Sequence, residues 1–256
     1  MSIDPLVRHK HRLGVKIWDT IKNVIKRFLD LSVVAPAGYI FRRVVRVENR
    51  LEISDVLRET TARECAAYVS ENMQHALEFG HREKLWAHAI SKISVTGIVA
   101  EFGVWNGYSI NYIASRIDQK VYGFDSFEGL KEDWDGSGAT KGTFSLGGHL
   151  PKVLKNVQLV KGWFDVTLPG FLNEHSENFR FIHVDCDTYE ATRTLFEQIA
   201  DRIIPGTVIV FDEYLGYRGW REGEFKAWQE LLVRYGFKSR YVGFCTRQVA
   251  LVVARD

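Results

Sequence analysis

The chain has 256 residues, 46% hydrophobic and 26% charged, which suits one large α/β domain with extensions and excludes a disordered or fibrous protein. Its three cysteines, Cys65, Cys186 and Cys245, show no CxxC spacing, which favours a reduced, cytoplasmic location over a disulfide-linked secreted domain. The net charge of +2 is uneven: residues 1–50 carry eleven Lys/Arg and four Asp/Glu, and the rest is mildly acidic, so we expect no nucleic-acid partner.

The first expected element is a basic amphipathic helix over residues 13–34. Its apolar residues recur at helical spacing: Ile17, Ile21, Val24, Ile25 and Phe28. Such a helix could lie on an anionic membrane surface, or cover a dimer interface or an active site. It could also simply pack on the domain, and this is the role that an apolar stripe most often has. Asp30 interrupts the most apolar stretch, FLDLSVVAPAG, so we expect no signal peptide, and no apolar run is long enough to span a bilayer.

Two further helices are expected before Thr96, where apolar runs begin to alternate with helical segments. One runs over residues 54–79 and stops at Gly80, and a short one covers residues 85–93. We therefore divide the chain into a basic arm (1–50) and a main domain (51–256), the latter with a helical lead-in (51–95) and an α/β core (96–256). A homodimer is the expected assembly.

From Thr96 onward, apolar β-branched runs alternate with helical segments. Strands are expected at 97–102, 121–125, 157–162, 179–185, 207–214, 240–244 and 248–254. Helices are expected at 109–117, 168–173, 188–203 and 222–235. This alternation predicts a doubly wound, Rossmann-like sheet of seven strands covered on both faces. The last two strands are joined too tightly for a crossover, so the final one must be antiparallel.

A glycine turn follows the first of these strands. The segment Glu101-Phe-Gly103-Val-Trp-Asn-Gly107-Tyr-Ser109 lacks the GxGxxG spacing of dinucleotide enzymes, but it allows close backbone approach before a helix N-terminus. The next strand ends in Asp125, 18 residues after Gly107, near the spacing expected for a carboxylate that binds ribose hydroxyls. Either feature alone could be structural, with the glycines forming a turn and the aspartate capping a helix. Both features together favour a site for a nucleoside ligand without a diphosphate.

Four carboxylates end two neighbouring strands. Asp185 and Asp187 follow one strand, and Asp212 and Glu213 follow the next. Like charges this close need a cation or a shared proton, and an oxygen-only donor set favours Mg²⁺, with Mn²⁺ or Ca²⁺ possible. The alternative is that two of them cap helices and the others are solvated.

Three other features carry less chemistry. His183 lies inside an apolar strand and is expected to be a core residue. Cys186, between two acids, is poorly placed for a thiolate nucleophile. Residues 127–150 form a long stretch with six glycines, typical of a mobile lid or a disordered loop.

The motifs AEFGVWNGYSINYIA, VYGFDSFEGL, VKGWFDVTLPGFL, HVDCDTYEAT and PGTVIVFDEY, in this order, resemble the macrocin O-methyltransferase (TylF-type) family. The resemblance covers about residues 97–230 and implies a class I fold, S-adenosylmethionine, Mg²⁺ and methylation of sugar hydroxyls on glycosylated natural products. The family's usual aspartate pair is Asp212-Glu213 here, and its PGG is PGT. The acceptor implied is a small glycosylated molecule.

The resemblance also implies roles for individual residues. The methionine end and ribose of the cofactor would be bound by Glu101, Gly103, Gly107 and Ser109, and Asp125 with its neighbour Ser126 would contact the ribose side. Gly162 and Trp163 would lie near the adenine, and Asp185 would border the cofactor as well. The metal would be held by Asp185, Asp212 and Glu213, and Asp187 would be the general base.

Two other functions fit part of these observations. A metal-dependent glycosyltransferase could use Asp185-Cys-Asp187 as its DxD motif, and it would bind nucleotide sugars without using the turn at Gly103–Gly107. A non-catalytic module docked on a membrane through its basic arm would bind a nucleoside without turnover. Neither explains all the residues at the strand ends.

Overall fold

The computed structural model describes residues 21, 23 and 52–254, and the chain divides into two compact units, residues 1–56 and 57–256. The expected arm helix over residues 13–34 lies outside the described residues except for Ile21 and Asn23, which are helical. The domain boundary expected near residue 50 stays a prediction. The account below concerns the second unit and the helix that leads into it.

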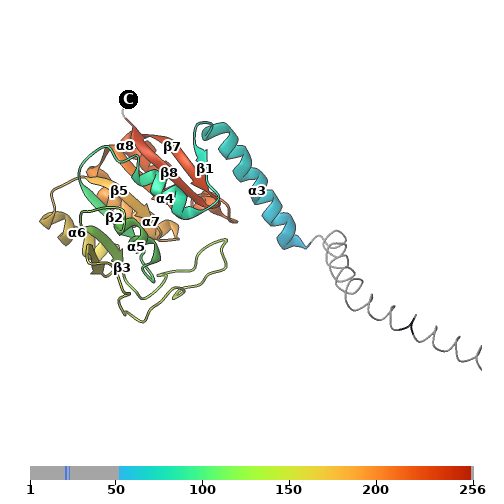
Figure 1. The fold of residues 1–256 in the computed structure, drawn as a ribbon, viewed down its shortest axis with the longest axis horizontal. Helices are drawn as coiled ribbons and strands as arrows, with labels where there is room; N and C mark the ends of the chain where they lie inside the picture. The colour runs from blue at the N-terminus through green and yellow to red at the C-terminus, as the bar shows by residue number, and fades with distance from the viewer. Residues whose placement is uncertain (1–20, 22, 24–51, 255–256) are drawn as a thin grey trace, which may run out of the picture. The chain divides into compact units, whose positions relative to one another are not determined.

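One mixed sheet forms the centre of the domain (Figure 1). Its strands are β1 (Leu77–Glu78), β2 (Ile98–Phe102), β3 (Val121–Asp125), β4 (Val157–Lys161), β5 (Phe179–Val184), β6 (Ile203–Phe211), β7 (Lys238–Cys245) and β8 (Gln248–Ala254). They lie in the order β1-β7-β8-β6-β5-β2-β3-β4, and β8 runs antiparallel to both of its neighbours, β6 and β7. The doubly wound sheet with an antiparallel last strand is therefore confirmed, and the two-residue β1 adds an eighth strand at the edge.

Helices cover both faces of this sheet. They are α3 (Ile53–Asn72), α4 (Arg82–Ile90), α5 (Tyr108–Ala114), α6 (Phe164–Glu174), α7 (Tyr189–Ile199) and α8 (Glu224–Tyr235), with 3₁₀ turns at Ala200–Arg202 and Trp220–Glu222. One core cluster joins the sheet to α4 and α5, and the other joins it to α6, α7, α8 and the end of α3. Because apolar side chains are needed on both faces, a central strand such as β2 (IVAEF) is buried along its whole length.

The lead-in differs from the sequence-based expectation. The helix expected over residues 54–79 ends at Asn72, because Met73 and Ala76 form turns and Leu77 pairs with Gly243 of β7. The Phe79 N–H then donates to the carbonyl of Phe244 at 2.9 Å. The apolar residues at 77 and 79 extend the helical pattern in the sequence. In the structure they instead pair with β7, a distant segment of the chain.

The glycine-rich loop between β3 and β4 is tied to itself and to the domain. The N–H of Leu130 donates to the carbonyl of Thr143, and the N–H of Gly142 donates back to Leu130, both at 2.9 Å. Phe127 and Trp134 are buried in the core clusters. The segment is therefore a loop with internal hydrogen bonds beside the carboxyl ends of the strands, and its role as a mobile lid stays a prediction.

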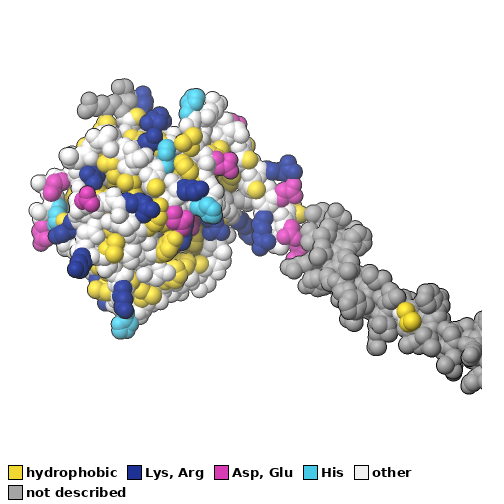
Figure 2. All heavy atoms as spheres, in the orientation of Figure 1, with side chains coloured by type: hydrophobic (Ala, Val, Ile, Leu, Met, Phe, Trp, Pro, Cys, Tyr) yellow, Lys and Arg dark blue, Asp and Glu magenta, His cyan; other side chains and the backbone are white. Residues whose placement is uncertain are grey.

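Charged side chains of both signs are interspersed on the face of the domain that Figure 2 shows. Among the described residues, no helix is both long and apolar enough to cross a bilayer.

Candidate functional site

The glycine turn after β2 is shaped by a very close backbone contact. Gly103 has a φ of 90°, and a Cβ atom placed there would lie 1.7 Å from the carbonyl oxygen of Asp185. Any other residue would push the ends of β2 and β5 apart. Gly107, with a φ of 83°, caps the N-terminus of α5. The turn therefore brings a helix start to the edge where the strand-end carboxylates gather.

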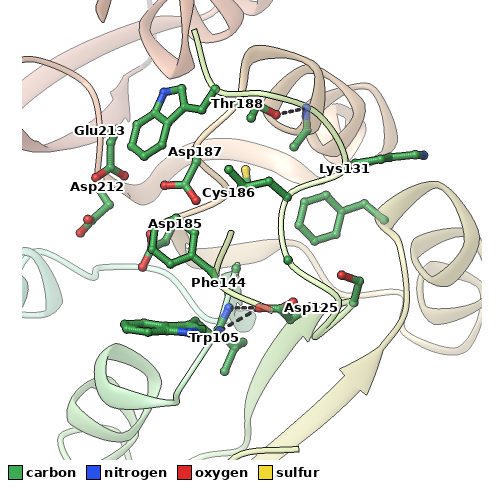
Figure 3. Close-up of a pocket in the computed structure, with 18 of the residues that line it drawn as sticks. Trp105, Asp125, Lys131, Phe144, Asp185, Cys186, Asp187, Thr188, Asp212 and Glu213 are labelled. Atoms are coloured by element: carbon green, nitrogen blue, oxygen red, sulfur yellow. Dashed lines mark hydrogen bonds between the residues drawn. The ribbon is translucent and has the colours of Figure 1, made fainter. Parts of the chain in front are cut away.

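Asp125, at the end of β3, holds this turn in place. Its Oδ2 accepts the N–H groups of Val104 and Trp105, both at 2.8 Å, and its Oδ1 accepts the N–H of Phe127 at 2.7 Å (Figure 3). A carboxylate offers about four acceptor positions, so about one remains for a ligand. Asp125 is thus a structural anchor of the turn as well as the candidate ribose contact.

A cavity of about 670 Å³ opens at this edge of the sheet. Ten of the sequence-predicted site residues line it: Gly103, Ser109, Asp125, Ser126, Gly162, Trp163, Asp185, Asp187, Asp212 and Glu213. Glu101 and Gly107 do not line it. Glu101 is fully buried behind the turn, and Gly107 acts through the backbone at the start of α5. In Figure 3, the carboxylates after β5 and β6 gather on one side of the cavity, opposite Asp125 and Lys131.

The carboxylates form two overlapping groups. Oxygens of Asp185, Asp187 and Glu213 all lie within 4.8 Å of one another, and so do ligand atoms of Asp185, Asp212 and His183. The predicted metal set of Asp185, Asp212 and Glu213 draws on both groups. Asp187, the predicted base, lies among the candidate ligands, at a residue held in a left-handed conformation with φ 65°.

Burial and mutual repulsion raise the pKa of these acids. Burial, followed by the charge of Asp212, raises the pKa of Asp187 to about 7, against the effect of Arg247. Burial and the charge of Asp212 also hold the pKa of Asp185 and of Glu213 well above their ordinary values. The cluster therefore favours either the binding of a positively charged ligand or the protonation of some of its carboxyl groups.

Glu213 supplies an observation that fits a cation. Its Oε2 is buried and has no hydrogen-bond partner, and the nearest basic group, Arg247, is 4.0 Å from its other oxygen. A buried acceptor without a partner costs free energy unless a ligand satisfies it. Oxygen donors from Asp185, Asp187 and Glu213 are the type that Mg²⁺ and Mn²⁺ accept. The residues present thus fit a divalent cation.

Several residues of the site were not predicted from the sequence. Glu224, the fully buried first residue of α8, accepts the N–H of Glu213 at 3.0 Å and so fixes the strand end behind the cluster. Trp105 and Phe144 both line the cavity with their rings 5.5 Å apart, although they come from different loops. A helix-starting glutamate and loop aromatics carry no distinctive sequence signal, so only the fold brings them here.

Two expectations about single residues have a clear outcome. The Cys186 thiol is buried, and burial together with the charge of Glu224 raises its pKa well above the ordinary value, which agrees with the expectation of a poor nucleophile. His183 is in the core, as expected, but its ring also reaches the acidic cluster. Its Nδ1 is 2.9 Å from Glu101 Oε2, and its Nε2 is 3.8 Å from Asp212 Oδ1.

Comparisons with known proteins agree with this geometry. Residues 100–214 match a family described as a methyltransferase domain. In an alignment over 143 residues that covers 47% of this chain, the chain is 29% identical to the 8-demethyl-8-(2,3-dimethoxy-alpha-L-rhamnosyl)-tetracenomycin-C 4'-O-methyltransferase of Streptomyces olivaceus. The match spans about half the length of that curated relative, 54%.

Two solved structures share the fold. CalS11, a calicheamicin methyltransferase, superposes with a TM-score of 0.56 at 19% identity and covers 79% of this chain and 94% of its own. The O-methyltransferase NovP gives a TM-score of 0.50 at 18% identity, with 68% and 78% covered. The chain therefore shares the fold of these two enzymes, and its residues 100–214 are similar to a methyltransferase domain, in agreement with the resemblance found in the motifs.

Proposed function

We propose that this protein is an S-adenosylmethionine-dependent, divalent-cation-dependent O-methyltransferase that acts on a sugar hydroxyl of a glycosylated natural product. The observation that carries the proposal is the joining, in one cavity, of a glycine turn suited to a nucleoside and a cluster of buried carboxylates suited to a cation. A glycosyltransferase would need only the second feature. A nucleoside-binding module would need only the first.

The cofactor end of the cavity lies between the turn and the start of α6. Asp125 offers its remaining acceptor position to a ribose hydroxyl, and Ser126 lies next to it on the cavity wall. Gly162 has a φ of 143° and precedes Trp163, whose ring provides a planar surface for adenine. Ser109 lines the same side, whereas Glu101 acts on it from behind by accepting its hydroxyl hydrogen at 3.0 Å.

The carboxylate end is suited to activating a hydroxyl. S-adenosylmethionine would supply the methyl group, and a cation held by Asp185, Asp212 and Glu213 would make the acceptor hydroxyl more acidic. Asp187 accepts the proton as the acceptor oxygen forms its bond to the methyl carbon and the bond from that carbon to sulfur breaks. Burial, the largest cause of the raised pKa of Asp187 in the cation-free protein, favours its role as proton acceptor.

The acceptor class follows from the relative and from the shape of the site. The relative in Streptomyces olivaceus is named for methylation of a rhamnosyl group, so a deoxysugar on an aromatic or macrocyclic skeleton is the first acceptor to test. Trp105 and Phe144 offer apolar ring surface beside the carboxylates for the body of such a molecule. A dimeric assembly, a cytoplasmic location and the absence of nucleic-acid and membrane partners stay predictions.

A methyl-transfer assay tests the proposal. The full chain is incubated with methyl-deuterated S-adenosylmethionine, Mg²⁺ and a panel of rhamnosylated acceptors, and products are followed by mass spectrometry. Label should reach an acceptor hydroxyl, and EDTA or Asp185→Asn should abolish the transfer, whereas Asp135→Asn, on the exposed loop, should not. Transfer that is undiminished by EDTA would overturn the cation-dependent reaction.

A further inference from the structure

A row of hydrogen-bonded groups joins helix α5 to strands β2 and β5 beneath the acidic cluster. Ser109 Oγ donates to Glu101 Oε1 at 3.0 Å, and Glu101 Oε2 is 2.9 Å from His183 Nδ1. Glu101 on β2 and His183 on β5 are direct partners in the parallel pairing of the two strands. Both side chains are fully buried, so the imidazole is held in one orientation by a neighbour that cannot move away.

The other ring nitrogen faces the cluster without a partner. His183 Nε2 is buried and makes no hydrogen bond. It lies 3.8 Å from Asp212 Oδ1, and it shares a space with Asp185 and Asp212 in which the ligand atoms are within 4.8 Å of one another. Ligand atoms on opposite sides of a small divalent cation are roughly 4.2 Å apart, so this spacing is compatible with a common cation.

The hydrogen bond on Nδ1 determines what Nε2 can do. An ionised Glu101 accepts hydrogen at both oxygens, from Ser109 and from His183 Nδ1, and in that tautomer Nε2 keeps its lone pair. A lone pair that faces two carboxylates is repelled by them, and a cation bound between them removes that repulsion. A carboxylate that orients an imidazole whose far nitrogen binds a metal is a recurrent arrangement in metalloproteins.

We propose that His183 Nε2 is a nitrogen ligand of the divalent cation at this edge, with Glu101 as the group that orients it. The inference rests on the cation site of the proposed function and specifies its donor set as mixed nitrogen and oxygen. Mg²⁺ prefers oxygen donors, whereas imidazole suits transition-metal ions. The site should therefore bind Mn²⁺ more tightly than Mg²⁺. This preference for Mn²⁺ should be larger than that of a site with oxygen ligands alone.

Mn²⁺ alone, added to the full chain without cofactor or acceptor, serves as the probe. Pulsed electron paramagnetic resonance should show a ¹⁴N coupling typical of a directly bound imidazole, and uniform ¹⁵N-histidine labelling should replace it with the ¹⁵N pattern. His183→Asn retains a side-chain N–H for Glu101 but removes Nε2. It should abolish the coupling and lower Mn²⁺ affinity by roughly 10–100-fold, with a smaller loss for Mg²⁺.

His175→Asn is the matched control, because the His175 ring contacts Tyr122 and Phe171 and lies outside the cavity lining. It should leave the coupling and the affinity unchanged. If Mn²⁺ binds but the wild-type spectrum contains no histidine nitrogen coupling, the assignment of His183 is overturned while the cation site stands. If Mn²⁺ does not bind at all, both the assignment and the cation site of the proposed function are overturned. A wild-type spectrum without histidine coupling overturns the assignment even if His183→Asn fails to fold.

Discussion

Replacing Asp187 with asparagine should slow methyl transfer and, at the same time, stabilise the cation-free protein at alkaline pH. Asparagine has the size of aspartate and tolerates the left-handed conformation found here, with φ 65°. The substitution removes the proton acceptor and one negative charge from a buried cluster. Turnover should therefore fall by roughly 10²–10⁴, the usual contribution of a general base, whereas binding of S-adenosylhomocysteine should change little.

The stability gain follows from the raised pKa of Asp187. Burial, followed by the charges of Asp212 and Asp125, raises this pKa from 3.8 to about 7. A carboxyl with a raised folded-state pKa supports folding fully at acidic pH and loses that support as the pH rises through about 7. At pH 8 the ionised Asp187 therefore costs the folded protein about 4 kcal/mol at most, and asparagine avoids this cost.

Urea denaturation in EDTA, at pH 4 and at pH 8, measures the effect. Asp187→Asn should resemble the wild type near pH 4 and exceed its free energy of unfolding by up to about 4 kcal/mol at pH 8. Asp135→Asn, in the exposed loop, should follow the wild type at both pH values. An equal stability difference at the two pH values, or wild-type turnover by Asp187→Asn, would refute this reasoning.

Three further substitutions and one truncation test the other assignments. Asp125→Ala should weaken binding of S-adenosylhomocysteine by roughly 1–3 kcal/mol in calorimetry, with exposed Asp118→Ala as control; equal affinities would contradict the assignment. Asp185→Asn and Asp212→Asn should lose Mg²⁺ affinity and regain part of their activity at high Mg²⁺, and a defect that Mg²⁺ does not relieve would argue against a ligand role. A chain that begins at Arg50 should fold and bind S-adenosylhomocysteine as the full chain does; failure to bind would show that the arm contributes to the cofactor site.

The parallel core could be predicted because its strands carry their own signal. Apolar, β-branched runs buried on both faces, such as residues 98–102 and 208–211, are distinguishable from amphipathic helices by composition and length alone. The two-residue β1 carries no such signal, since its pairing with Gly243 and Phe244 arises only when the domain is assembled. The end of α3 was misplaced for the same reason.

The candidate site could be predicted as far as the strand ends determine it. Chain order and the parallel topology place Asp185, Asp187, Asp212 and Glu213 at one edge, and the structure gathers them there. Side-chain direction is a different matter. The sequence does not reveal that Asp125 accepts three backbone N–H groups, or that His183 turns its free nitrogen toward the carboxylates. The bonds of Asp125 depend on how the turn after β2 meets the end of β3, and the orientation of His183 depends on Glu101, 82 positions away in the chain.

The most direct test of the central claim is calorimetric titration of the full chain with S-adenosylhomocysteine in Mg²⁺, with UDP-glucose titrated in parallel. The cavity joins a nucleoside site to a cation site, so S-adenosylhomocysteine should bind one per chain, and UDP-glucose should bind far more weakly or not at all. Tight Mg²⁺-dependent binding of UDP-glucose, with no heat from S-adenosylhomocysteine, would contradict the assignment of this cavity to methyl transfer.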